Sequence, residues 1–306
     1  MLFYKKRDIN GFLLIDKPTG ISSNHTLQQV KGIFNAKKAG YIGTLDPLAT
    51  GMLPICFGES TKFSHYLNNS DKKYNVIAKL GEKTSTCDSS GIILKKRTIS
   101  FTFIELNNAL KELTGAISQI PSMYSAIKYN GIPLYKYARK GLDISRNVRH
   151  IKIYKLNLIE QKNNLIELNV HCSKGTYIRT LIDDLGEKLR CGAHVISLRR
   201  TQVGLLSCAK LITIPYLKEL LSNTGTKKID SLLMPIDTPV DFLSKVYLSK
   251  QQSLNFKLGQ KINFKSNIKN SLVRVFDKEK KLFLGLGKIN TELILIPYRL
   301  ISICTN

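Results

Sequence analysis

The stretch Gly43-Thr44-Leu45-Asp46-Pro47-Leu48-Ala49-Thr50-Gly51 sets an acidic residue between two glycines and directly before a proline. Gly43 and Gly51 free the backbone at both ends of the stretch. Pro47 fixes one backbone dihedral and pushes Asp46 towards an extended conformation. A stiffened loop that presents the Asp46 carboxylate is one interpretation. The spacing alone favours another, a plain Asp-Pro turn in which Asp46 bonds its own backbone.

Apolar periodicity on both sides of this loop predicts alternating short elements. Residues 11–16 form an apolar run that ends in the turn-forming Lys17-Pro18-Thr19-Gly20, which predicts a buried strand. Ser22 or Ser23 can then cap a helix that extends to about residue 34. After the loop, the pattern predicts a strand, a helix and a second strand, at residues 52–57, 60–67 and 73–80.

The rest of the chain continues in this mixed order. We expect an amphipathic helix at 102–113, a hairpin of strands 149–160 and 164–172, and a helix at 176–189. Shorter elements follow at residues 195–203, 205–209 and 215–221, then at 272–276, 282–286 and 293–296. The order lacks regular βαβ alternation, which favours an α+β fold. A Pro-rich boundary near 235–239 separates a large domain, 1–235, from a small β-rich module, 240–306.

The charge balance indicates a polyanionic partner. The 306 residues include 47 Lys and Arg against 22 Asp and Glu, a net charge of +25. Such an excess creates a positive field that attracts nucleic acid, with an affinity that falls steeply as salt rises. A compositional bias towards Lys explains part of the excess as well. Charge alone therefore does not decide the function.

Cysteine and histidine spacing predicts neither a metal site nor a cofactor site. No two cysteines form a C-x-x-C pair, the histidines lack metal-ligand spacing, and no phosphate-binding glycine loop is present. No apolar run has the length of a membrane-spanning helix. We therefore expect a cytoplasmic protein without cofactors, in which all the cysteines are free thiols: Cys56, Cys87, Cys172, Cys191, Cys208 and Cys304.

Two further positions can carry chemistry. Arg179 follows Cys172-Ser173-Lys174-Gly175 and falls in the first turn of a predicted helix. An arginine beside a carboxylate lowers the carboxyl pKa and aligns the group through forked hydrogen bonds. Locally, a solvated helix residue is the simpler interpretation. Tyr74 starts a strand, so it either packs at the edge of a core or stacks on an unpaired base.

Residues 121–141 mix tyrosines, prolines, glycines and basic side chains, among them Tyr124 and Lys128. The mixture is too irregular for a core element and predicts a surface excursion. Aromatic rings between basic residues suit a nucleic acid with exposed bases. A solvated loop folded back on its own tyrosines fits the pattern equally well.

Taken together in chain order, these motifs resemble the TruB family of bacterial synthases that make pseudouridine at position 55 in the T-loop of transfer RNA. The stretch from Gly43 to Gly51 resembles the family's catalytic motif. The resemblance extends from about residue 10 to 210, and more weakly to the end. Its other matches are Leu14-Ile15-Asp16-Lys17-Pro18-Thr19-Gly20, Lys38-Ala39-Gly40, Lys73-Tyr74, Pro121-Ser122-Met123-Tyr124-Ser125-Ala126 and Gly175-Thr176-Tyr177-Ile178-Arg179-Thr180-Leu181.

The resemblance implies a role for each matched residue. Asp46 would be the catalytic carboxylate, Arg179 would pair with it and keep it ionised, and Tyr74 would stack on the flipped base and serve in proton removal. The family breaks the C1′–N1 bond, rotates the uracil and rejoins it through C5, without a metal or organic cofactor. The residues expected to support the site or contact the RNA are Lys17, Tyr41, Tyr177, Lys128 and Tyr124.

Two adjacent positions depart from the family pattern. The family usually has histidine where this chain has Tyr41, and a small polar residue where it has Ile42. The histidine is thought to fill the space that the flipped base leaves in the RNA. Tyrosine also has a flat ring and a polar tip, so stacking could survive. The substitution bears on RNA distortion and affinity more than on bond chemistry.

The resemblance also implies an architecture and a partner. We expect a catalytic domain with a long central antiparallel sheet and a cleft, an RNA-gripping insertion at about 121–146, and a C-terminal PUA-like module. The partner would be the T-arm of tRNA, bound by a monomer that needs no other protein. Two alternatives are an RNA-binding or tRNA-folding factor that has lost catalysis, and a guide-RNA-dependent relative.

Overall fold

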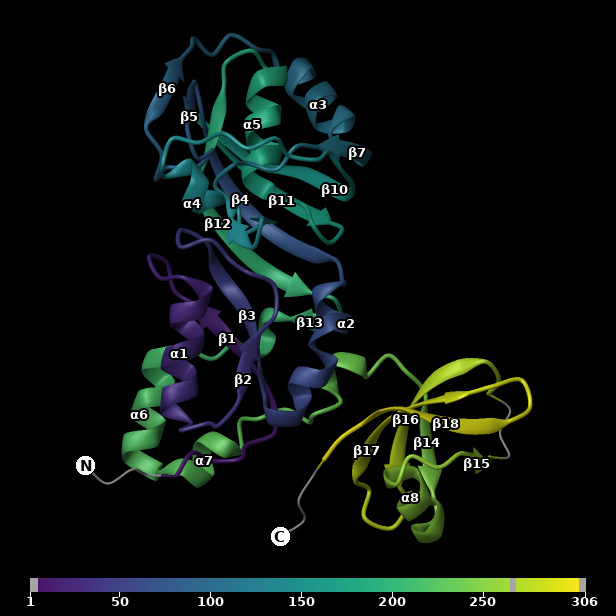
Figure 1. Cartoon of the computed structure of the whole chain (residues 1–306). Coiled ribbons are helices and arrows are strands. Elements are labelled where there is room, and N and C mark those ends of the chain that lie inside the picture. The colour runs from purple at the N-terminus through teal and green to yellow at the C-terminus, as the bar shows by residue number, and fades with distance from the viewer. Residues whose placement is uncertain (1–4, 265–267, 303–306) are drawn as a thin grey trace.

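The computed structural model describes residues 5–264 and 268–302. Figure 1 shows an elongated molecule in which one large sheet runs through two halves, with a small module beside the lower half. The large sheet has nine strands, ordered β1-β3-β12-β4-β11-β10-β7, with β2 on β3 and β13 on β12. These strands are β1 (Gly11–Lys17), β2 (Ala39–Tyr41), β3 (Thr50–Phe57), β4 (Lys72–Leu80), β7 (Gly115–Gln119), β10 (Arg149–Lys162), β11 (Leu165–Cys172), β12 (Ala193–Val203) and β13 (Leu206–Ser207).

The predicted mixed fold with a long central sheet is confirmed, with one difference in strand direction. Within the described residues, neighbouring strands of the large sheet pair antiparallel except β3 and β12, which run parallel. That short parallel contact joins Thr50 and Gly51 to Arg199 and Arg200. It connects the two halves of the sheet directly beside the loop that carries Asp46.

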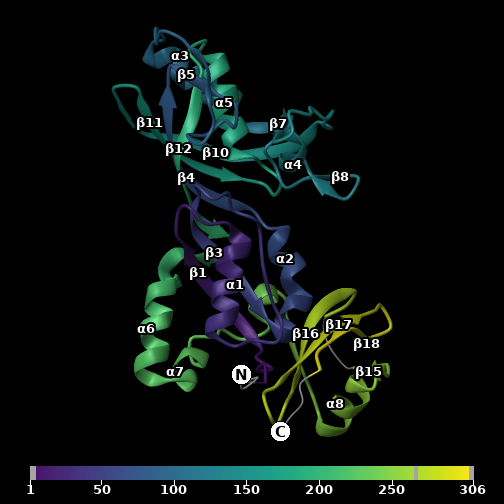
Figure 2. The same cartoon turned by 60° about the vertical axis from the view of Figure 1, so that its left-hand side comes forward.

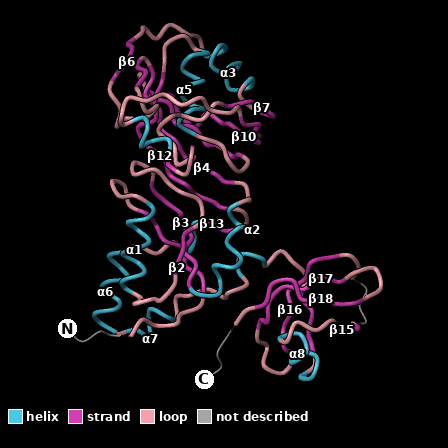
Figure 3. Tube along the Cα trace, in the orientation of Figure 1, coloured by secondary structure: helices cyan, strands magenta, loops and turns pink. Residues whose placement is uncertain are grey.

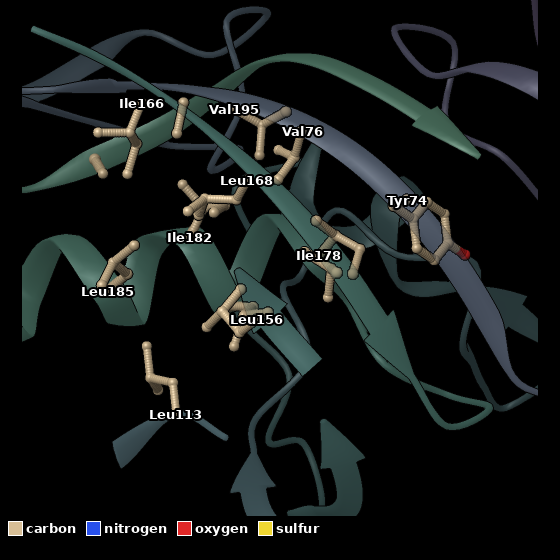
Figure 4. Close-up of a cluster of buried hydrophobic side chains, with 14 of the residues drawn as sticks. Tyr74, Val76, Leu113, Leu156, Ile166, Leu168, Ile178, Ile182, Leu185 and Val195 are labelled. Atoms are coloured by element: carbon tan, nitrogen blue, oxygen red, sulfur yellow. The ribbon is translucent and has the colours of Figure 1, made fainter. Parts of the chain in front are cut away.

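Two helices cover one face of the upper half of the sheet. α5 (Ile178–Lys188) buries Ile178, Leu181, Ile182 and Leu185, the spacing of one helical face. α3 (Phe103–Glu112) begins with a capping box between Thr102 and Glu105, and it packs on the same core. Figure 4 shows α5 residues meeting side chains of β4, β11 and β12. The alternating apolar side chains of these strands therefore place one face of the sheet against this core.

Separate helices cover the lower half. α1 (Ser23–Ile33) is capped by the Ser22 side chain, which accepts a hydrogen bond from the backbone N–H of His25. α6 (Ile214–Thr224) and α7 (Thr226–Asp230) lie beside α1 (Figure 2). These helices enclose an apolar cluster with β1 and β3 that includes Leu13, Val30 and Leu217.

Several boundaries differ from the predictions because tertiary contacts override local pattern. The helix predicted at 60–67 is a 3₁₀ helix, η1 (Gly58–Phe63), followed by the short α2 (Ser64–Asn68). The strand predicted at 205–209 is only β13, followed by η2 (Cys208–Lys210). The sequence pattern also missed β5 (Glu82–Thr84), β6 (Ile93–Lys96) and β7. Such short pieces carry too few residues for a periodic signal.

Residues 121–141 form a small surface excursion, part of which is buried against the rest of the domain. They contain β8 (Lys128–Tyr129), β9 (Ile132–Pro133) and α4 (Leu134–Ala138), separated by loops (Figure 3). Leu134 is buried, whereas Tyr129 and Ile132 are exposed. The predicted surface excursion is confirmed and the stretch also folds on its own tyrosines, while its contact with nucleic acid stays a prediction. The Tyr137 hydroxyl donates to the carbonyl oxygen of Tyr129 at 3.3 Å.

The expected β-rich C-terminal module is present and has its own five-stranded sheet, ordered β14-β16-β17-β18-β15. An additional helix, α8 (Lys250–Lys257), was not predicted, although Ser249 and Gln252 form a capping box at its start. The η3 turn (Thr238–Val240) leads into the module. The strands are β14 (Lys245–Leu248), β15 (Ile262–Asn263), β16 (Ser271–Asp277), β17 (Phe283–Ile289) and β18 (Ile294–Leu300).

The module is held to the large domain by an aromatic contact and a buried ion pair. Phe63 of η1 lies 5.5 Å from Phe283, centroid to centroid. Arg274 Nη1 of β16 lies 2.9 Å from Asp237 Oδ2, which is in the segment that precedes the module. Among the described residues, no helix is long and apolar enough to cross a membrane. The described cysteines are free, and Cys304 lies outside the described residues.

We expect Phe63→Ala to lower the free energy of unfolding by about 3–5 kcal/mol, because it removes a fully buried ring from the contact with the module. Phe103→Ala is the matched control. Phe103 is 63% exposed, so its truncation should change stability by no more than about 0.5 kcal/mol. Urea unfolding of both variants measures the difference. Equal losses would mean that the Phe63 contact does not stabilise the fold.

Candidate active site

The loop that carries Asp46 is held in place by side chains from β1 and α1. Lys17, which is fully buried, donates from Nζ to the carbonyl oxygens of Ala49 (2.7 Å), Pro18 (2.8 Å) and Pro47 (3.3 Å). Ser23 Oγ bonds both the N–H and the carbonyl oxygen of Leu45, at 2.8 and 2.9 Å. The loop is therefore rigid for a reason that lies outside its own sequence.

The two glycines of this loop allow β12 to approach it closely. Gly43 and Gly51 have φ angles of +69° and +92°, which side chains disfavour. A Cβ atom on Gly51 would lie 2.4 Å from the carbonyl oxygen of Arg200, and one on Gly43 would lie 2.9 Å from Arg200 Nη1. Glycine is thus required at both positions by conformation and by space.

Arg179 connects the Asp46 loop to two other segments. Its Nε lies 2.9 Å from Asp46 Oδ2. Nη1 donates to the carbonyl oxygen of Thr86 at 2.9 Å and lies 3.1 Å from Asp88 Oδ2, and Nη2 donates to the carbonyl oxygen of Tyr124 at 2.7 Å. Only 5% of its side chain is exposed. A solvated helix residue, the simpler local interpretation, is therefore not what the structure shows.

Asp88 is a site residue that the sequence interpretation missed. Its Oδ1 accepts hydrogen bonds from Thr86 Oγ1 at 2.6 Å, from Ser90 Oγ at 2.5 Å and from the Ser90 N–H at 3.0 Å. The hydroxyl residues two positions before and after Asp88 are a local signal for a bonded carboxylate. Its pairing with Arg179, 91 residues away, carries no local signal.

Burial and two nearby cations shift the pKa of Asp46 in opposite directions. Burial raises the pKa of the Asp46 carboxyl, while Arg179 opposes the rise, Asp88 adds to it and Lys17 opposes it. Burial also lowers the pKa of Lys17 to about 8, against the opposing influence of Asp46. The Asp46 side chain remains 38% exposed. It is thus an accessible carboxylate whose ionised form depends on Arg179 and Lys17.

Asp46 and Arg179 line a cavity of about 650 Å³ together with Tyr74 of β4 and Leu198 and Arg200 of β12. Tyr74 is 8% exposed and stands at the end of the apolar cluster, with its oxygen pointing away from that cluster (Figure 4). The interpretation that Tyr74 packs at the core edge is confirmed. Tyr74 also lines the cavity, and its stacking on an unpaired base stays a prediction. Further basic side chains line the same cavity: Lys72, Arg149, His150 and Lys174.

The remaining predicted residues occupy different places. Tyr177 lines the cavity, and the Arg149 guanidinium lies 5.9 Å from the centre of its ring. Tyr124 contacts the site through its backbone carbonyl oxygen, which accepts the hydrogen bond from Arg179. Lys128 is exposed on β8 and does not line the cavity. Tyr41 is also outside the lining and packs, partly buried, on the core beneath α1.

Leu198 and Arg200 are two further residues that sequence reasoning missed, although they lie in a strand that was predicted. Strand alternation places both on the same face of the sheet, but it does not distinguish a core position from a cavity position. Over the described ranges, no group of three or more His, Cys, Asp or Glu side chains could hold a metal ion.

Comparison with known proteins assigns the chain. Residues 31–178 match the TruB family pseudouridylate synthase N-terminal domain, residues 179–241 match the tRNA pseudouridylate synthase B C-terminal domain, and residues 244–301 match the pseudouridine synthase II TruB C-terminal domain. These matches define the class of the protein as a pseudouridine synthase, which is an isomerase. Within that class, the chain belongs to the TruB family.

Full-length relatives and solved structures agree with this assignment. The chain is 66% identical over 312 residues to tRNA pseudouridine synthase B of Buchnera aphidicola subsp. Schizaphis graminum, covering 100% of both. It is 50% identical over 301 residues to that of Escherichia coli K12, covering 96% of both. A Cbf5-Nop10-Gar1 complex contains a chain with a TM-score of 0.70 and 25% identity, with 95% of this chain and 84% of that chain covered.

We expect Arg179→Lys to slow the single-turnover reaction by about 10- to 100-fold, because one ammonium group cannot reach acceptors in three segments. Affinity for RNA should change little. Arg190→Lys is the control, since the Arg190 side chain is 79% exposed and pairs with Glu105 at the surface. Rapid-mixing kinetics with saturating enzyme gives both rates. If lysine sustained the wild-type rate, the forked geometry would be unnecessary.

Proposed function

We propose that this chain isomerises uridine 55 in the T-loop of tRNA to pseudouridine, with Asp46 as the catalytic carboxylate. One observation carries the proposal: Asp46 Oδ2 lies 2.9 Å from Arg179 Nε in a cavity that Tyr74 also lines. The relatives at 50–66% identity, named tRNA pseudouridine synthase B, support tRNA as the substrate class.

The dimensions and lining of the cavity suit a single flipped nucleotide. A base in a stacked loop hides its glycosidic bond, so the enzyme must extrude the nucleotide before reacting with it. A cavity of about 650 Å³ lies in the usual range for small ligands. Tyr74 and Tyr177 offer aromatic faces on which a base can stack.

The isomerisation conserves the atomic composition of the nucleoside, because the proton that C5 loses is replaced by one that N1 gains. Breaking the C1′–N1 bond leaves the electron pair on N1, and the uracil rotates and bonds C1′ through C5. C5 then loses its hydrogen as a proton, and N1 gains one. Attack by the carboxylate on C1′, attack on C6 and assisted elimination to a glycal all require an ionised Asp46. Arg179 and Lys17 oppose the rise of its pKa that burial causes.

The surface around the cavity supports binding of a folded RNA. Arg149 and Lys174 lie at the cavity, and the net charge of +25 adds a long-range attraction. We assign catalysis to residues 1–235, with the 121–146 insertion and the 240–306 module gripping the T-arm. Residues 125–127 line the cavity directly, which supports the role of the insertion.

We further propose that the chain acts in the cytoplasm as a monomer without a protein partner. The similar Cbf5 structures are of complexes with Nop10 and other components. An enzyme that carries its own means of gripping tRNA needs no guide for that purpose.

We expect Asp46→Asn to abolish tritium release from tRNA labelled at uridine C5 while tRNA affinity stays within about threefold, because the basic surface is unchanged. Glu112→Gln, at an α3 side chain that is 64% exposed and outside the insertion, serves as the control and should retain release. A transcript with cytidine at position 55 should release no tritium.

This assay tests each part of the proposal separately. Absence of release by the wild type would leave only an RNA-binding or tRNA-folding role. Release by Asp46→Asn would remove the assignment of the carboxylate. Release from the cytidine-55 transcript would refute the position while leaving the activity intact. Loss of tRNA binding by a folded Asp46→Asn would contradict the separation of binding from catalysis.

We expect Tyr41→His to change tRNA affinity or the rate by less than about tenfold, because Tyr41 lies outside the cavity lining and packs on the core beneath α1. Filter binding and single-turnover release measure the two effects. Ile33→Ala, at a partly buried neighbour in the same cluster, controls for general loosening of the packing. A large loss in the histidine variant would show that tyrosine is required here.

A further inference from the structure

Arg200 of β12 is a buried cation with an unusual set of partners. It is 1% exposed. Among the residues that the structure describes, it has no carboxylate within ion-pair distance. Its neighbour Arg199 forms a forked pair with Asp16 at 2.8 and 3.0 Å. Burying a guanidinium without a nearby anion costs free energy of folding. The position of Arg200 beside the cavity therefore indicates a role in the site.

The guanidinium of Arg200 bonds the backbone at both ends of the Asp46 loop, and Arg200 lies beside the cavity tyrosine. Nε donates to the carbonyl oxygen of Met52 at 2.8 Å, and Nη2 donates to that of Gly43 at 2.9 Å. Tyr74 is the cross-strand partner of Arg200 on β4, and both residues line the cavity. Of these neighbours, only the Tyr74 hydroxyl can become an anion.

We propose that Arg200 is a positioning residue that orients the Tyr74 hydroxyl at the cavity wall and favours its ionised form for removal of the C5 proton. This inference rests on the proposed function. After C5 bonds C1′, C5 carries one hydrogen and C6 is doubly bonded to N1. The phenolate oxygen takes that hydrogen as a proton, the released pair forms C5=C6, and the former C6=N1 pair takes a proton from water at N1.

The other charged and titratable groups that face Tyr74 do not supply this effect. Burial raises the pKa of the Tyr74 hydroxyl, Arg200 opposes the rise, and Cys172 of β11 and Asp46 add to it. Arg200 is therefore the cation that opposes burial at this group. Without its charge the pKa of Tyr74 rises further, so the phenolate forms only at higher pH.

A spectroscopic titration tests the inference without requiring turnover. Fluorotyrosine placed at position 74 of the full chain reports its own ionisation through the ¹⁹F chemical shift. We expect Arg200→Gln, which removes the charge, to raise the ionisation midpoint by about one pH unit or more. Arg200→Lys, which keeps the charge, should raise it less and serves if the glutamine variant does not fold. Arg199→Lys, on the same strand, should leave the midpoint unchanged.

Kinetics gives an independent readout. We expect Arg200→Gln to slow single-turnover tritium release by about tenfold at neutral pH and to move the rise of the pH–rate profile to higher pH, with unchanged tRNA affinity. In a Tyr74→Phe background the same substitution should have little further effect.

Two results would overturn the assignment: an ionisation midpoint that does not respond to loss of the Arg200 charge, or a rate loss of equal size with and without the Tyr74 hydroxyl. The second result would mean that Arg200 acts only through the Asp46 loop. If wild type releases no tritium but the midpoint still shifts, the proposed function fails and the Arg200–Tyr74 coupling remains.

Discussion

The ion pair between Arg179 and Asp46 is the interaction on which the site depends. One guanidinium satisfies acceptors from the Asp46 loop, the Thr86–Asp88 turn and the insertion at Tyr124. If one of these partners moved away, the buried guanidinium would keep an uncompensated charge or an unpaired donor, which costs free energy. The three segments are therefore held together because each supplies an acceptor to the same guanidinium. Of these segments, the Asp46 loop and the insertion line the cavity, together with residues of β4 and β12.

The site contains two buried arginines with different surroundings. Arg179 faces two carboxylates, whereas Arg200 faces backbone carbonyls and the Tyr74 hydroxyl. Burial raises the pKa values of both Asp46 and Tyr74, and in each case the adjacent guanidinium opposes the rise. The enclosure that excludes water from a flipped base would otherwise hold both groups in their neutral forms.

Much of the fold could be predicted from the sequence because helix caps and apolar periodicity indicate the same elements that the structure contains. The Ser22 cap, the apolar face of α5 and the alternation of β4 each gave the correct element. Short or tertiary-dependent elements were missed, such as β5, β6 and α8. For the candidate site, the Gly43–Gly51 stretch and the first turn of α5 were visible as motifs. The predicted turn is present in the backbone, because the Ala49 N–H donates to the carbonyl oxygen of Asp46 at 3.0 Å. The Asp46 carboxylate, however, pairs with Arg179, and the interpretation of Arg179 as a solvated residue was wrong.

The sequence by itself determined a basic α+β chain with an acidic residue in a turn bounded by glycines, because glycine and proline restrict or free their own backbone dihedrals and apolar periodicity is a property of one helix or strand. Only the tertiary structure decided that Asp88 and Arg200 belong to the site. Asp88 meets Arg179 across 91 residues, and Arg200 meets Gly43 across 157. Contacts over such separations depend on the packing of whole strands and helices, so no local pattern of residues encodes them.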